Sequence, residues 1–206
     1  MSRVLHISCS PRGDRSYSTR VAREFVSAYR DAHPDDEIDS LDLFTHDIPD
    51  FRAPEAAAKY AVLSGQEPRD EAARAWRPVI DTIRSFMSYD KYVLSTAMWN
   101  FSIPYRLKQY IDVLVQPGLT FSFSPATGYT GLVTGKRVAL VLARGGAYGE
   151  PASAALDFQK AYLQLILGFI GITDVQSIVV EPTLGPEAEK ATSTAVSQAR
   201  AIAAAF

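Results

Sequence analysis

The chain has 206 residues, of which 47% are hydrophobic and 21% charged, and its formal net charge is -2. These values are ordinary for a globular protein, and we expect residues 1–206 to form a single domain with a sizeable core. The chain has no basic excess to neutralise the phosphates of a duplex, which argues against nucleic acid as a partner. No apolar stretch is long enough to span a bilayer, so we expect no membrane insertion.

The N-terminus and the cysteine content bear on the compartment. The first residues, MSRVLHIS, enter a strand-like run without the pattern of a signal peptide. Cys9 is the one cysteine, so the chain cannot form an internal disulfide, as is typical of a reducing compartment. We therefore expect a cytoplasmic protein.

Strand-like and helical patterns alternate through the first half of the chain. A strand is expected at 3–8, followed by a loop rich in serine and arginine at 9–18 and then by a helix. The next elements predicted are a strand at 37–43, an irregular segment with a short helix at 44–68, and a helix at 70–88. Pro78 is expected to kink this last helix or to divide it.

The second half repeats the alternation and adds a hairpin. Apolar and polar residues alternate over 119–133 between turn signals, which predicts a β-hairpin. The other elements expected are strands at 91–96, 136–143 and 174–182, helices at 104–115, 156–171 and 187–206, and a glycine-rich loop at 144–153.

This order predicts an α/β fold, with a doubly wound, five-stranded parallel sheet that has helices on both faces. In such sheets ligands bind beyond the carboxyl ends of the strands, where the strand order reverses. The loops 9–18, 97–103 and 144–150 occupy these ends, so we expect the functional site there.

The first of these loops offers hydroxyls at the start of a helix. Ser10, Ser16 and Ser18 lie there with Arg12 and Arg15, and hydroxyls beside free N–H groups suit a phosphate. The alternative is that Ser16 or Ser18 is simply an N-cap.

The other two loops offer rings and bare backbone. Met98, Trp99, Asn100 and Phe101 could line a flat ring, and the glycines after Arg144 would let the backbone approach a ligand closely, although a tight turn would also explain them. The three loops together suggest a flat ring with one phosphate, and hence flavin mononucleotide (FMN).

Several other sites are not indicated. The first loop lacks the G-x-G-x-x-G of dinucleotide sites, and GLVTGKR (131–137) is one residue too short for a phosphate loop and precedes a strand. There is no G-x-S-x-G of a hydrolase and no spacing of metal ligands. His6 is read as a core residue and Cys9 as inert.

Five segments, SCSPRGDRSYS, MWNFSIP, GLVTGKR, ARGG and LGFIGITDV, occur in an order and spacing that resembles the FMN-dependent NADH-azoreductases of the flavodoxin-like quinone reductase group. The resemblance covers essentially the whole chain. It implies a flavodoxin-like homodimer that transfers hydride from NADH or NADPH to FMN, and then from FMN to a quinone or azo compound. The residues that it implies for FMN binding are Ser10, Ser16, Tyr17, Ser18, Met98, Trp99, Asn100, Phe101, Ala143, Arg144, Gly145 and Gly146.

The resemblance also implies active sites at the subunit interface. Phe121, Phe123 and Phe169 are candidates for a substrate wall supplied across the dimer, although ordinary core positions remain the alternative. The helix over 156–171 supports a dimer independently, because it is apolar nearly all round and therefore needs cover on more than one side.

Two departures and two alternatives remain. Trp99 stands where the family commonly has tyrosine, and Ala143 where it often has serine. The preference between NADH and NADPH is not decided by the sequence. A flavodoxin-type electron carrier with no substrate of its own is the first alternative function, and a binding module that has lost its flavin is the second.

Overall fold

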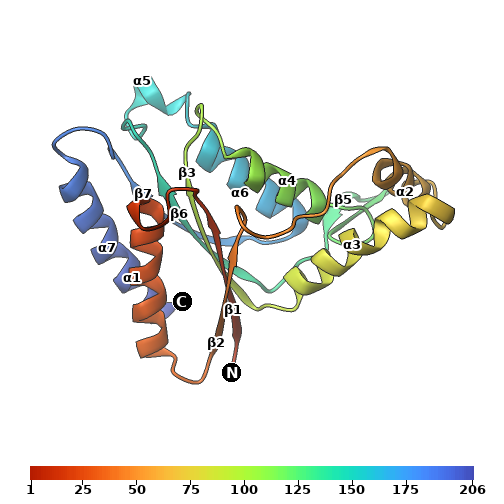
Figure 1. The fold of residues 1–206 in the computed structure, drawn as a ribbon, viewed down its shortest axis with the longest axis horizontal. Helices are drawn as coiled ribbons and strands as arrows, with labels where there is room; N and C mark the ends of the chain where they lie inside the picture. The colour runs from red at the N-terminus through yellow and green to blue at the C-terminus, as the bar shows by residue number, and fades with distance from the viewer.

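The computed structural model describes residues 1–206 and contains a central sheet of five parallel strands (Figure 1). The strand order across the sheet is β2-β1-β3-β6-β7, so the direction of winding reverses between β1 and β3. This confirms the predicted doubly wound sheet. The strands are β1 (Arg3–Cys9), β2 (Glu37–Asp42), β3 (Lys91–Ala97), β6 (Arg137–Ala143) and β7 (Asp174–Val180).

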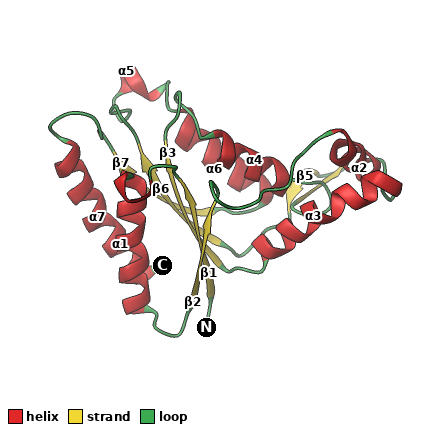
Figure 2. Cartoon of the chain, viewed as in Figure 1, coloured by secondary structure: helices red, strands yellow, loops and turns green.

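Helices cover both faces of the sheet (Figures 1 and 2). On one face lie α1 (Tyr17–Ala32) and α7 (Ala188–Ala205), and on the other lie α3 (Asp70–Met87), α4 (Tyr105–Leu114) and α6 (Phe158–Ile170). The smaller elements are a 3-10 turn (Gly13–Arg15), α2 (Ala53–Leu63) and the single-turn helix α5 (Pro151–Ala154). None of the helices is both long enough and apolar enough to cross a membrane.

The core consists of two layers because the central strands are buried on both faces. Alternate residues of one strand point to opposite layers: Val93 packs with α1 and α7, whereas Leu94 packs with α3, α4 and α6. Because successive side chains of a strand point to opposite faces of the sheet, the apolar side chains are shared between two helical layers. This arrangement holds the carboxyl ends of β1, β3 and β6 side by side.

Two local expectations need correction. Pro78 was expected either to kink the helix or to divide it, and the division is wrong, since α3 runs continuously through Pro78. A proline removes one intrahelical hydrogen bond, and the burial of Trp76, Val79 and Ile83 along the same helix compensates for that loss. The segment 144–153, expected to be a loop, also contains α5, whose four residues are too few to produce a periodic pattern.

The predicted hairpin is formed by β4 (Phe121–Ser124) and β5 (Gly128–Gly131) and docks on the last turn of α6. The N–H of Val133 donates to the carbonyl of Ile170 at 2.8 Å. A Cβ at Gly131 would lie 2.2 Å from the nitrogen of Gly171, so only glycine permits this approach. The hairpin thus lies at the end of α6 remote from its first residue, Phe158.

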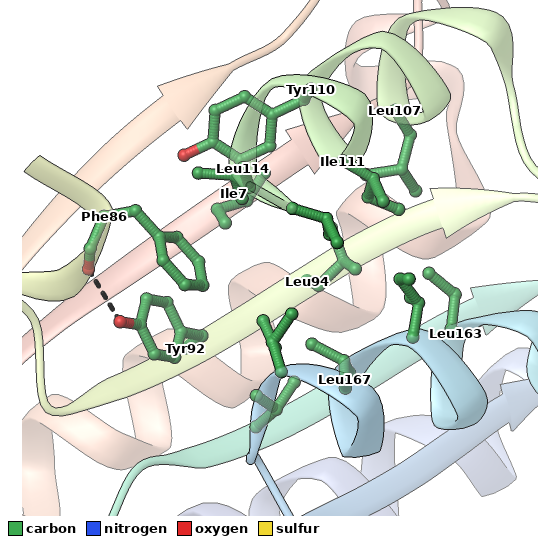
Figure 3. Close-up of a pocket in the computed structure, with 14 residues that line it drawn as sticks. Ile7, Phe86, Tyr92, Leu94, Leu107, Tyr110, Ile111, Leu114, Leu163 and Leu167 are labelled. Atoms are coloured by element: carbon green, nitrogen blue, oxygen red, sulfur yellow. Dashed lines mark hydrogen bonds between the residues drawn. The ribbon is translucent and has the colours of Figure 1, made fainter. Parts of the chain in front are cut away.

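An apolar cavity of about 40 Å³ lies between the sheet and helices α3, α4 and α6 (Figure 3). Leu94 lines it from β3, Ile111 from α4 and Leu163 from α6. The hydroxyl of Tyr92 donates to the carbonyl of Phe86 at 2.6 Å and so is satisfied at its margin. All the lining residues are hydrophobic, so the cavity is a packing defect of the core and has no polar group that could bind a phosphate.

Candidate active site

Three loops meet at the carboxyl edge of the sheet. Cys9 at the end of β1 is in register with Thr96, and Ala97 at the end of β3 is in register with Ala143 at the end of β6. The N–H of Met98 donates to the carbonyl of Ala143 at 2.8 Å, which extends the pairing by one residue. The loops after β1, β3 and β6 therefore begin next to one another.

The first loop ends in a helix N-terminus with free donors. Ser16 caps α1: its hydroxyl accepts from the N–H of Thr19 at 3.4 Å and lies 3.1 Å from the hydroxyl of Ser18. The N–H groups of Tyr17 and Ser18 donate to no acceptor in the chain. Ser10, Ser16 and Ser18 are all buried. Ser16 is thus an N-cap, and the two free N–H groups beside it still fit a phosphate.

The second loop is a tight turn that presents aromatic rings. Trp99 and Ser102 exchange two backbone hydrogen bonds of 2.9 Å, and the φ angles of Asn100 and Phe101 between them are +47° and +67°. Positive φ at both central residues is the signature of a type I′ turn, and it is costly for a bulky residue such as phenylalanine. Backbone strain of this kind collects at ligand-binding positions. Trp99 and Phe101 remain exposed.

The side chain of Arg144 in the third loop turns away from the surface. It is 3% exposed and forms ion pairs with Asp157 at 2.8 Å and Glu181 at 3.3 Å. Its Nε donates to the side-chain oxygen of Gln159 at 3.2 Å. The Asp157 contact acts through charge, since the N–H bonds of Nη2 are not aligned with the carboxylate. Arg144 can therefore meet a ligand only through its backbone.

The glycines that follow leave room above the sheet edge. Gly145 lies under Leu184, whose N–H donates to the Gly145 carbonyl at 3.2 Å, and Gly146 is exposed. The ring of Tyr148 lies across Gly146 and packs edge-on against Phe101 with 6.3 Å between centroids. Tyr148 thus borders the site from the third loop.

Two more aromatic residues border the site and were not anticipated from the sequence. Phe44 follows β2, Tyr105 begins α4, and both rings lie about 6 Å from that of Trp99, with centroid separations of 6.0 Å and 6.3 Å. Phe44 sat in a segment without periodicity, and Tyr105 looked like an ordinary helix residue. Phe44 reaches Trp99 because β2 and β3 end at the same edge of the sheet, and Tyr105 reaches it from the start of the helix that follows β3.

The predicted wall residues lie elsewhere in their own chain. Phe121 and Phe169 pack with centroids 4.9 Å apart at the hairpin, and Phe121 is buried, whereas Phe123 exposes 60% of its surface. Phe158, at the opposite end of α6, donates its N–H to the carbonyl of Phe101 in the second loop. The 13 residues of α6 separate the hairpin from the loops, a span of about 20 Å at 1.5 Å per residue.

Two titratable groups near the site are buried. Burial raises the pKa of the Cys9 thiol to about 12, so the thiol stays protonated at neutral pH. Burial, reinforced by the charge of Arg23, lowers the pKa of His6 to about 4, and its Nε2 lies 3.1 Å from the hydroxyl of Ser95. No group of three histidine, cysteine or acidic side chains comes together that could hold a metal ion.

Known proteins share this fold. Residues 2–203 match the family described as having a flavodoxin-like fold, and the chain belongs to that family. Over 215 residues, which cover 100% of both chains, it is 51% identical to an FMN-dependent NADH:quinone oxidoreductase of Nitratidesulfovibrio vulgaris strain DP4. This finding confirms the family resemblance seen in the sequence.

Solved structures agree with this placement. An azoreductase from Bacillus anthracis strain Sterne superposes with a TM-score of 0.91 at 29% identity, covering 100% of both chains. An FMN-dependent NADH-azoreductase from Bacillus anthracis strain Ames Ancestor, solved in complex with FMN, has a TM-score of 0.89 at 25% identity and covers 100% of this chain and 99% of its own.

Proposed function

We propose that this protein is an FMN-dependent oxidoreductase that transfers hydride from NADH or NADPH, through bound FMN, to quinones and aromatic azo compounds. The observation that carries the proposal is the convergence of a free helix N-terminus, a strained aromatic turn and exposed glycine backbone at one sheet edge. The names of the full-length relatives point to the same activity. The alternative of an electron carrier finds no support among them.

The three loops divide the task of holding the cofactor. The N–H groups of Tyr17 and Ser18, with the hydroxyls of Ser10 and Ser16, would hold the phosphate. Met98, Trp99, Asn100 and Phe101 would line the flavin ring, and the backbone of Ala143, Arg144, Gly145 and Gly146 would meet its edge.

The chain itself needs no acid–base dyad. FMN, when bound, would supply the hydride chemistry that links the nicotinamide donor to the acceptor. The side chains then have to orient the two substrates and exclude water. We also propose that residues 1–206 form a single domain. A cytoplasmic location also belongs to the proposal, because NADH and a free thiol such as Cys9 coexist there.

A homodimer would complete the site. The hairpin carries exposed aromatic surface at Phe123 and Tyr129, α6 exposes Leu165, and no part of the same chain covers these side chains. The hairpin cannot reach the loops of its own chain across the length of α6. We therefore propose that Phe123, supported by Phe121 and Phe169, walls the site of a second copy. A light-scattering mass of one chain at micromolar concentration would contradict the dimer.

The first test of function is spectroscopic. The protein is mixed with FMN, desalted, and treated with NADH without oxygen. We expect a retained flavin spectrum that bleaches with NADH and returns when a quinone is added. Loss of all flavin on desalting would contradict the cofactor site, and bleaching without reoxidation by any quinone or azo dye would favour the carrier.

Asn100→Ala tests the location of the ring. The variant is expected to retain less flavin or to turn over more slowly. Alanine tolerates the positive φ less well than asparagine does, and the substitution removes the side-chain amide. Ala154→Ser on the nearby helix α5 is a matched surface control. Unchanged flavin affinity and kinetics in Asn100→Ala would show that the ring lies elsewhere.

A further inference from the structure

Three aromatic side chains form a cluster beside the proposed flavin site, which we call the aromatic platform: Phe44, Trp99 and Tyr105. The Phe44 and Tyr105 rings meet edge to face at 88° with centroids 6.0 Å apart, and Trp99 is tilted by 46–47° to both. Trp99 is 37% exposed and Tyr105 is 64% exposed. Phe44 packs partly against the core and Trp99 also borders the proposed flavin ring, whereas the exposed face of Tyr105 has no other use in the chain and is free to stack on a flat group.

The platform is held in place. Arg106 donates from Nε to the carbonyl of Leu43 at 2.7 Å and from Nη2 to the carbonyl of His46 at 2.5 Å, which ties the turn that carries Phe44 to helix α4. The N–H of Phe44 donates to the carboxylate of Asp42 at 2.9 Å. A clamped turn whose neighbouring rings stay exposed suits binding better than packing.

Topology places the platform next to the proposed phosphate loop. Phe44 follows β2 and Trp99 follows β3, and these two strands are separated by β1. Their rings therefore meet across the end of β1, where the loop with Ser10 and Ser16 begins. Arg12 and Arg15 in that loop are exposed and form no ion pair and no side-chain hydrogen bond, so the loop that adjoins the platform carries two free cations.

From these features we infer that the aromatic platform binds the adenine ring of the NADH donor. The inference rests on the proposed function, which makes a dinucleotide the donor. The chain has no G-x-G-x-x-G loop to hold the adenosine half, so that half needs another holder. A flat base stacks on exposed aromatic faces, and the neighbouring arginines meet the charge of the pyrophosphate.

The test compares two donors of the same hydride. Reduced nicotinamide mononucleotide has the reacting ring of NADH but lacks the adenosine half. In Tyr105→Ala, the KM for NADH is expected to rise roughly tenfold, as for the loss of one base-stacking contact. The KM for reduced nicotinamide mononucleotide and the retention of FMN should not change. Tyr105→Phe keeps the ring and should behave like the unmodified protein.

A binding measurement supplies a readout besides activity. ADP-ribose, which carries adenine and pyrophosphate without nicotinamide, is titrated calorimetrically into the FMN-loaded protein. Its Kd is expected to rise by about the same tenfold factor in Tyr105→Ala and to stay unchanged in Tyr105→Phe.

Three results would overturn the inference. One is an equal rise in KM for both donors, and another is no change for either. The third is a change confined to the KM of a two-ring azo dye, which would assign the platform to the acceptor. A chain that binds FMN but never oxidises NADH would overturn the proposed function itself, whereas an active protein with unaltered variants would overturn this inference alone.

Discussion

Replacing Arg144 with alanine is expected to destabilise the fold strongly, although the residue lies in a loop. The guanidinium is 3% exposed and forms ion pairs with Asp157 and Glu181, which are 14% and 18% exposed. It also bonds the side chain of Gln159, which is fully buried. Alanine would leave two acidic groups without a counter-charge and a buried amide without a partner.

The size of the effect follows from burial. Removing one partner of a buried ion pair costs about 3–5 kcal/mol, because the remaining charge stays desolvated. The loop would loosen as well, since the side chain of Arg144 ties it to Asp157, Gln159 and Glu181, and only the backbone bonds to Val180 and Thr183, of 3.0 Å and 2.8 Å, would remain. We therefore expect weaker FMN retention together with lower stability.

Urea unfolding, with and without FMN, measures the decrease in the free energy of unfolding. Arg200→Ala is the matched control, because Arg200 pairs with Glu24 at the surface, where the two side chains are 62% and 40% exposed. Such a pair contributes about 0–1 kcal/mol. Arg144→Lys keeps the charge but not the planar guanidinium. Its decrease in the free energy of unfolding should therefore lie between the decreases of Arg144→Ala and Arg200→Ala. If Arg144→Ala costs no more than Arg200→Ala, the reasoning from burial is refuted.

Two further predictions concern the hairpin and the sheet. Gly131→Ala should lower the free energy of unfolding by about 1–3 kcal/mol, because its Cβ would overlap the backbone at Gly171 and force the hairpin off α6. Gly149→Ala, whose nearest contact would be an ordinary 3.5 Å, is the control, and equal unfolding curves for the two would contradict the close approach. The second prediction concerns the pH dependence of stability. The pKa of His6 is lowered from 6.5 to about 4, so the unfolded chain binds more protons between these values and stability falls as the pH falls through this range. Between pH 7 and pH 5 this contribution is about 2 kcal/mol, and it should vanish in His6→Asn; identical pH profiles would refute it.

The pattern of the sequence was sufficient for the architecture. Strand-length apolar runs alternating with amphipathic helices define a doubly wound sheet, and the loops at the strand ends could be named as the candidate site region without coordinates. Ser16 at a helix start and the glycines after Arg144 were visible as local chemistry. These features are local because they depend on periodicity or on the conformational range of single residues.

Other features depend on contacts between distant segments. Arg144 looked like a ligand contact, yet its partners come from positions 157, 159 and 181, and no local pattern predicts that pairing. The continuity of α3 through Pro78 was decided by burial, which outweighed one lost hydrogen bond.

Tertiary structure alone also decided the surroundings of the site. Phe44 reaches Trp99 only because β2, β1 and β3 end at the same edge. The length of α6 puts Phe123 beyond reach of the loops in its own chain. The sequence by itself determined which elements form and where a ligand could bind. The packing of those elements determined which side chains gather at that edge, because side chains far apart in the sequence meet only when the sheet is assembled.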